Sequence, residues 1–286
     1  MRRFVDTRMG QVCCHEEGQG APLLMIHQSG QSARMFFEAL PLLGRTRRAI
    51  AIDLPGFGLS DSMPEGASMA DLADLCVDVL DALGIARADV YGHHSGNKIA
   101  TELSVRAPDR VKRLVLAGQS HSIIADRDAR NAAIAKFTSP HTALAAIDDP
   151  VAAAAEKWMR TLSTVSSAWT QPGAASSDEV RRHARRQALD AIDGAEGSAR
   201  LYAANTAYDL GQGYTRIPVE TLLIEIVTDE EDEMIGRQGA PVCALIPNAR
   251  LAEISAPNGD GVTLEWQAQD LVGCLEEFLG EPDDNT

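Results

Sequence analysis

The sequence has little basic charge, no long apolar run and few cysteines, and each shortage excludes a class of protein. Its 26 basic residues are outnumbered by 41 acidic ones, and the formal net charge of −15 argues against nucleic acid or an anionic membrane as a partner. Residues 1–6 carry charge and no apolar run follows them, so we expect neither a signal peptide nor a membrane span. The five cysteines lack a C-x-x-C pair, which is typical of free thiols in a reducing compartment. The sequence therefore predicts a cytoplasmic protein.

Strand and helix patterns alternate along the chain, which predicts a mostly parallel sheet with helices on both faces. Ser68 is placed to cap a helix whose apolar residues recur at helical spacing until Gly84 ends it. Short apolar runs at 88–91 and 111–117 predict strands. Cys13 and Cys14 adjoin on another expected strand, where their side chains face opposite ways, and we interpret both as packing residues.

The segment 90–96, V-Y-G-H-H-S-G, has the spacing of a nucleophile elbow. In this sharp strand-to-helix turn, flanking glycines make room for a strained residue that points into an active site. Counting between Gly92 and Gly96 places His94 at that position. The competing register would place Ser95 there, but its flanks would then be His93 and Asn97, whose side chains crowd the turn.

Four motifs in this order resemble the α/β-hydrolase family: residues 22–27 leading into His27-Gln28, the D-L-P-G-F-G-L-S-D loop at 53–61, the strand-like run 217–224 and the segment 246–251. The resemblance covers nearly the whole chain and implies an α/β-hydrolase fold, with an eight-stranded sheet, helices on both faces and a helical cap. It places the core in residues 1–118 and 218–286. The hundred or so residues between the two parts have a helical pattern without strand signals, which predicts a cap domain at 119–217.

The family's catalytic histidine, which follows the last strand, is absent. None of the seven histidines lies beyond His183, and the alignment places Asp260 at that position, with Gly259 or Gly261 as neighbouring registers. Asp229 occupies the family's acid position. A serine–histidine relay is therefore excluded, and we expect His94 to be catalytic with Asp260 and Asp229 as its carboxylate partners.

Further residues are expected around this centre as oxyanion or substrate-binding groups. The backbone N–H of Ser95 and a donor from Gln28 are candidates for an oxyanion site. We interpret His27 as a supporting residue beside them and His93 as a packed one. The candidates for the pocket wall are His121, Trp158, Trp169, Tyr202 and Tyr208.

Three functions remain open from the sequence. The first is an enzyme that uses His94 as general base or nucleophile on a small apolar substrate, in ester, lactone or epoxide hydrolysis or in a lyase or cyclisation step. The second is a catalytically inactive protein that binds a small molecule in the same pocket. The third is a metal site of His94, Asp229, Asp260 and His27, which lacks any short ligand spacing. We favour the first, with no cofactor and no metal, and the oligomeric state is left open.

Overall fold

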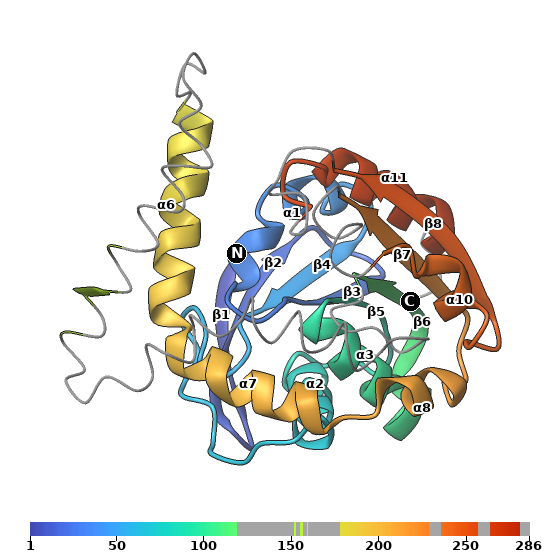
Figure 1. Cartoon of the computed structure of the whole chain (residues 1–286), viewed down its shortest axis with the longest axis horizontal. Coiled ribbons are helices and arrows are strands. Elements are labelled where there is room, and N and C mark those ends of the chain that lie inside the picture. Colours follow the sequence, from blue (N-terminus) through green and yellow to red (C-terminus); the bar gives the residue numbers. More distant parts are fainter. Residues whose placement is uncertain are drawn as a thin grey trace.

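The computed structural model describes residues 1–118, 178–228, 236–256 and 264–280, with isolated helical positions at 152, 155, 156 and 159. Eight strands form one sheet in the order β1-β2-β4-β3-β5-β6-β7-β8 (Figure 1). Their bounds are β1 Arg2–Thr7, β2 Gly10–Glu17, β3 Pro22–Ile26, β4 Arg48–Ile52, β5 Ala88–His93, β6 Val111–Ala117, β7 Thr221–Val227 and β8 Ala249–Ser255. β2 pairs antiparallel with β1 and β4, and the other neighbours are parallel. The predicted fold, a mostly parallel eight-stranded sheet, is confirmed.

Helices cover both faces of the sheet (Figure 1). They are η1 Ala33–Phe36, α1 Leu40–Leu43, α2 Met69–Ala82, α3 Ser95–Arg106, η2 Pro108–Arg110, α6 Asp178–Asp193, α7 Ala195–Ala207, α8 Leu210–Thr215, α10 Gly239–Cys243 and α11 Ala268–Leu279. Along β3, Leu24 and Ile26 join the apolar cluster under α2 and α3, while Leu23 and Met25 join the cluster under α1 and α11. This alternation of buried side chains gives a sheet that is apolar on both faces, as parallel sheets require.

The local sequence signals place several elements where they were expected. Ser68 and Asp71 form a reciprocal capping box at the start of α2, each side chain accepting the other residue's backbone N–H. The 111–117 strand is β6, and the 88–91 strand extends to His93 as β5. β7 begins at Thr221 rather than at the expected residue 217. Residues 217–220 therefore lie outside the strand, and one of them, Pro218, has no N–H to donate to a neighbouring strand.

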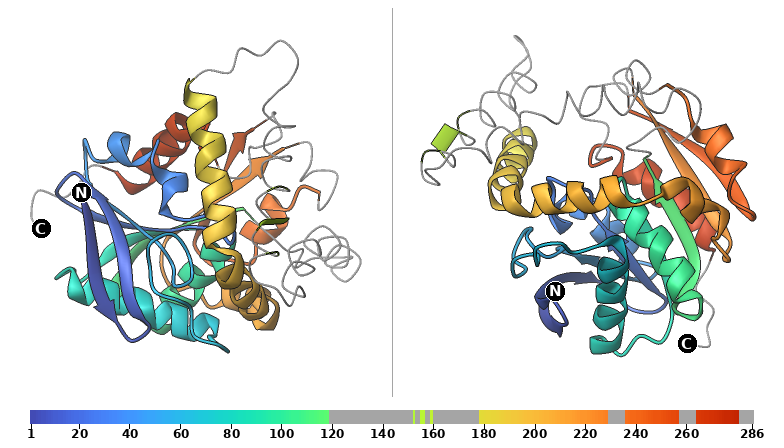
Figure 2. Two further views of the ribbon diagram at one scale, coloured as in Figure 1. Left: turned by 90° about the vertical axis from the view of Figure 1, so that its left-hand side faces the viewer. Right: turned by 60° about the horizontal axis from the view of Figure 1, so that its bottom comes forward.

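The described part of the insertion between β6 and β7 consists of α6, α7 and α8, which we call the insertion helices. Among the residues that the structure describes there, none is in a strand. α7 and α8 both contact α3, and Figure 2 shows α7 lying across the core while α6 projects from it. Asp190, buried at the carboxyl half of α6, accepts hydrogen bonds from Ser32 Oγ at 2.8 Å and Arg34 at 2.7 Å. A separate cap over 119–217 stays a prediction.

α7 lies close against the core at a pair of glycines. A Cβ on Gly197 would overlap the backbone of Gly56, which itself has a φ of +81° in the 53–61 loop. Nearby, Arg200 donates a hydrogen bond to the carbonyl of Met63. The insertion helices are therefore fixed to the loop that follows β4.

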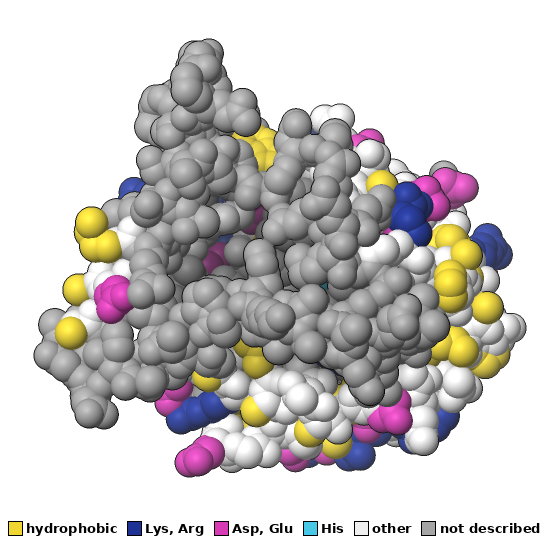
Figure 3. Space-filling model, in the orientation of Figure 1, with side chains coloured by type: hydrophobic (Ala, Val, Ile, Leu, Met, Phe, Trp, Pro, Cys, Tyr) yellow, Lys and Arg dark blue, Asp and Glu magenta, His cyan; other side chains and the backbone are white. Residues whose placement is uncertain are grey.

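The surface carries both signs of charge. In Figure 3, acidic and basic side chains are interspersed on the described part of that face, so the acidic excess is not gathered there into one patch. Among the described helices, none combines the length and the apolar content that crossing a membrane requires.

Candidate functional site

His94 is the turn residue between β5 and α3. Its φ of 46° and ψ of −103° are strained values for a residue with a side chain. A Cβ on Gly92 would overlap the backbone of Gly96, and a Cβ on Gly96 would overlap the carbonyl of Ile26. Both flanking positions thus need glycine, as the predicted G-x-His-x-G spacing requires.

The imidazole of His94 lies against the carboxyl end of β6. The backbone N–H of His94 donates to Ala117 O at 2.9 Å. A Cβ built on Gly118 would lie 2.5 Å from Nε2 of the His94 ring. Asn97 on α3 fixes this glycine by donating to its carbonyl oxygen at 3.1 Å. The side chain of His94 is nearly buried, with 9% of its surface exposed. The imidazole is thereby held at the edge of the sheet where the parallel strands end.

Ser95 does not occupy the turn position. It is the first residue of α3, and its Oγ accepts a hydrogen bond from Asn205 Nδ2 on α7 at 2.9 Å. Both residues are buried. The serine hydroxyl is thus used to join the elbow to an insertion helix, a partnership across more than a hundred residues that the sequence pattern did not predict.

His27 has both ring nitrogens occupied by backbone groups. Nε2 accepts the N–H of Leu54 at 2.9 Å, and Nδ1 lies 2.7 Å from the carbonyl oxygen of Gln28, to which it donates as the neutral tautomer. Burial lowers the pKa of His27, so the ring stays uncharged. This geometry is that of a support for the loop carrying Gln28, which is itself partly exposed.

His93 is fully buried and its Nδ1 lies 2.7 Å from the hydroxyl of Tyr91, while its ring lies against that of His94 with the centroids 5.0 Å apart. Tyr202 and Tyr208, two of the aromatic candidates, lie on or next to α7. The hydroxyl of Tyr208 donates to Glu102 at 3.0 Å, and that of Tyr202 faces Ser29 in the loop after β3. Tyr202 therefore belongs to the surroundings of Gln28, while Tyr208 is tied to the far half of α3.

Lys98 is a buried lysine that sequence reasoning missed. It lies one turn of α3 after the elbow, 1% of its surface is exposed, and its Nζ has no hydrogen-bond partner among the described residues. Burial lowers its pKa to about 7. The i, i+4 spacing from His94 was the only available signal, and it does not reveal that α8 and α7 close over this part of α3.

The other expected site residues lie outside the described residues: Asp229, Asp260, His121, Trp158 and Trp169. The described residues do show where the segments that carry Asp229 and Asp260 leave the sheet. β7 pairs with β6 through Ala117 and Ile224, and the buried Thr228 follows it; β8 lies next to β7 and is followed by the buried Ala256. These strands end on the same sheet edge as Gly118 and His94.

A cavity of about 840 Å³ lies between residues 65–70 at the start of α2, Glu102 of α3 and one side of α7. Its lining includes Ser68, Glu102, Arg200 and Tyr208. His94 is not among the lining residues, so this cavity is separate from the elbow.

Comparison with known proteins finds the same fold in other proteins. The family model described as alpha/beta hydrolase fold matches residues 21–257. Over 110 residues the chain is 42% identical to the 2-hydroxymuconate semialdehyde hydrolase of Pseudomonas sp. strain CF600, an alignment that covers 37% of this chain and 39% of that protein. In such alignments the chain spans about two fifths of the length of the curated relatives.

Two solved structures resemble the whole chain. A hydrolase from Pseudomonas aeruginosa PA01 is 26% identical with a TM-score of 0.72, and the match covers 98% of each chain. The enol-lactonase from Burkholderia xenovorans LB400 is 21% identical with a TM-score of 0.71, covering 97% of this chain and 99% of that one. At that identity the second likeness is one of fold alone.

Proposed function

Because the chain belongs to the alpha/beta hydrolase fold family, we propose that it hydrolyses a small, largely apolar ester or lactone with His94 as general base or nucleophile. The observation that carries this proposal is the position of His94: a nearly buried imidazole in the strained turn between β5 and α3, packed on Gly118. The named activity of one relative, the 2-hydroxymuconate semialdehyde hydrolase, supports a carbonyl substrate.

In the general-base route, a ring nitrogen of His94 takes a proton from water as its oxygen attacks the acyl carbon. The charge that develops on the carbonyl oxygen meets the N–H of Ser95 at the first turn of α3, with Gln28 as second donor. The imidazolium then returns the proton to the departing oxygen. In the nucleophilic route a ring nitrogen of His94 attacks the acyl carbon, the bond to the alcohol oxygen breaks and that oxygen takes up a proton; water then hydrolyses the acyl-imidazole, which releases the acid and the free ring.

A carboxylate beside His94 completes the proposed site. Such a partner orients the ring and stabilises the imidazolium formed during the reaction. We assign this role to Asp260, with Asp229 as the second carboxylate. Support comes from the strands that precede them, since β7 and β8 end at the sheet edge where His94 packs on Gly118.

The rest of the insertion is proposed as the wall of the substrate pocket, with His121, Trp158 and Trp169 contributing to it. The described insertion helices support this, because Tyr202 of α7 faces the loop that carries Gln28. The five cysteines are free, which supports a reducing compartment such as the cytoplasm.

The proposal is tested by turnover of a panel of aryl esters, lactones and epoxides. On the substrate found, His94→Ala should abolish turnover, while Ser95→Ala, which keeps its backbone N–H, should lose far less. Asp260→Asn should reduce kcat about a hundredfold, the usual scale for general-base catalysis. Mass spectrometry of acid-quenched reactions separates the routes, since only the nucleophilic one leaves an acyl group on His94.

The opposite pattern would overturn the assignment. If Ser95→Ala is inactive and His94→Ala is not, the serine register is correct. If Asp260→Asn turns over at the parent rate, Asp229 is the remaining orienting residue. If the protein binds panel members without turning any over, the chain is a small-molecule binding protein built on this fold.

A further inference from the structure

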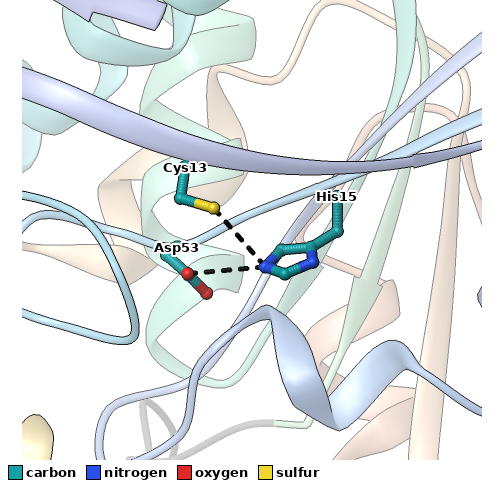
Figure 4. A group of neighbouring side chains, drawn as sticks. All are labelled: Cys13, His15 and Asp53. Carbon is teal, nitrogen blue, oxygen red and sulfur yellow. Dashed lines mark hydrogen bonds and ion pairs between the residues drawn. The ribbon is translucent and has the colours of Figure 1, made fainter. Parts of the chain in front are cut away.

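Cys13, His15 and Asp53 meet on one face of the sheet (Figure 4). Cys13 and His15 are alternate residues of β2, so their side chains share a face. Asp53 follows β4 and is joined to β2 by its N–H, which donates to Cys13 O at 2.9 Å. A thiol, an imidazole and a carboxylate are thereby gathered from neighbouring strands.

The thiol of Cys13 and the carboxylate of Asp53 both lie close to the same ring nitrogen of His15. His15 Nε2 lies 3.6 Å from Cys13 Sγ and 3.6 Å from Asp53 Oδ2, and the candidate ligand atoms of the three residues all lie within 4.8 Å of one another. In a tetrahedral zinc site, bond lengths of about 2.3 Å to sulfur and about 2.0 Å to nitrogen separate those two atoms by about 3.5 Å. A catalytic relay would instead use both ring nitrogens, one for each neighbour.

We propose that Cys13, His15 and Asp53 bind a divalent metal ion of the zinc class, with solvent as the remaining ligand. Thiolate, imidazole and carboxylate are the three protein ligand types found in zinc sites. The thiol of Cys13 is fully buried, whereas 15% of the His15 side chain is exposed, which leaves that side open to an ion and to a water ligand.

The surroundings hold the ligands in place, as the outer contacts of metal sites do. Asp53 accepts the N–H of Ala33 on Oδ1 at 2.8 Å and that of Leu59 on Oδ2 at 3.0 Å, and each oxygen retains a lone pair. The hydroxyl of Ser60 donates to Asp53 O and accepts the N–H of Cys13. The ring of His15 packs on that of Phe37, with centroids 5.0 Å apart.

The charge on the site suits a dication. The carboxylate of Asp53 and the thiolate of Cys13 would together supply two negative charges to the ion. A bound metal forms its bond to the Cys13 thiolate and displaces the thiol proton to solvent. The cation Arg34 is nearby, but its guanidinium is paired with Asp190 at 2.7 Å.

The site would link β2 to the loop that begins at Asp53 and carries Gly56 against α7. Metal binding should therefore stabilise the folded chain by mass action. This inference is independent of the function proposed for His94, and it departs from the expectation, drawn from the sequence, that Cys13 only packs and that no metal is bound.

Titration of the metal-free full chain with Zn²⁺, followed by calorimetry in two buffers of different ionisation enthalpy, tests the site. We expect one ion per chain, release of a proton, and a higher melting temperature. Co²⁺ should give a sulfur-to-metal charge-transfer band. Cys13→Ser should remove that band, and His15→Gln should weaken zinc binding by about tenfold or more.

Cys243→Ser is the matched control, since it removes another free thiol far along the chain and should change neither measurement. If Cys13→Ser fails to fold, zinc protection of Cys13 from alkylation in the parent chain, read residue by residue by mass spectrometry, replaces it. Absence of the cobalt band, or zinc binding that Cys13→Ser and His15→Gln leave unchanged, overturns the proposal.

Discussion

Asn205 on α7 donates a hydrogen bond to Ser95 Oγ over 2.9 Å, so a buried pair of side chains ties an insertion helix to the first residue after the elbow. The bond keeps the Ser95 hydroxyl directed at α7. It also makes the position of α7 and the geometry of the elbow depend on one another.

This pair should be energetically coupled. A double-mutant cycle with Asn205→Ala, Ser95→Ala and both together should give a coupling free energy of about 1 kcal/mol in chemical unfolding. Thr206→Ala serves as the control, because Thr206 is exposed and bonds only within α7. Additive effects of the two substitutions would mean that the bond contributes nothing to stability.

Organophosphonate probes that label activated serines should not react at Ser95. Its hydroxyl already accepts from Asn205, and the family's histidine after the last strand is absent from the sequence. Intact-protein mass after incubation with the probe is the measurement. The variant His94→Ser should also remain unlabelled, because a hydroxyl at the elbow still lacks that histidine. Stoichiometric labelling at Ser95 would contradict the assignment of His94 as the reactive group.

Gly118→Ala should displace the imidazole of His94, since the added Cβ would lie 2.5 Å from Nε2. We expect turnover to fall about a hundredfold, as for a misplaced catalytic group. Gly84→Ala is the matched control: Gly84 has a φ of +69°, close to the +66° of Gly118, but nothing lies within 4 Å of its Cβ position. Equal losses of activity in the two variants would show that backbone strain, and not contact with His94, is responsible.

Lys98→Met should stabilise the fold, most strongly at and below about pH 7. Burial lowers the pKa of Lys98 from 10.5 to about 7, so between these values the unfolded chain holds a proton that the folded chain has lost. The stability of the parent should therefore rise with pH across that window. Urea unfolding from pH 6 to 10 should show this rise reduced in Lys98→Met and kept in Lys112→Met, a control at a half-buried lysine. If the free energy of unfolding of Lys98→Met rises with pH as steeply as that of the parent, a group other than Lys98 is responsible for the rise.

Local signals in the sequence sufficed for much of the fold. Ser68 caps α2 as expected because a capping box depends only on residues one turn apart. The elbow was predictable for a similar reason: Gly92 and Gly96 are needed by the backbone around a single turn. The start of β7 was misplaced, because an apolar run does not reveal where pairing with a neighbouring strand begins.

Contacts between distant segments were not predictable. The bond between Asn205 and Ser95 depends on how α7 lies across α3, which no local pattern encodes. The meeting of Cys13 and His15 with Asp53 requires the register between β2 and β4, and the order of strands in the sheet determines that register. The alternate spacing of Cys13 and His15 on a strand was the available signal. That Asp260 and Asp229 are carboxylate partners of His94 stays a prediction.

The close approach of Gly56 and Gly197 restricts how this fold can be altered. A slide of α7 by one turn, about 5.4 Å, would bring Leu201 to a place without room for a Cβ. An insertion or deletion that moves Gly197 away from Gly56 should therefore destabilise the fold. A chimaera that exchanges the insertion for that of a relative has to retain the glycine at 197 and its phase along the helix.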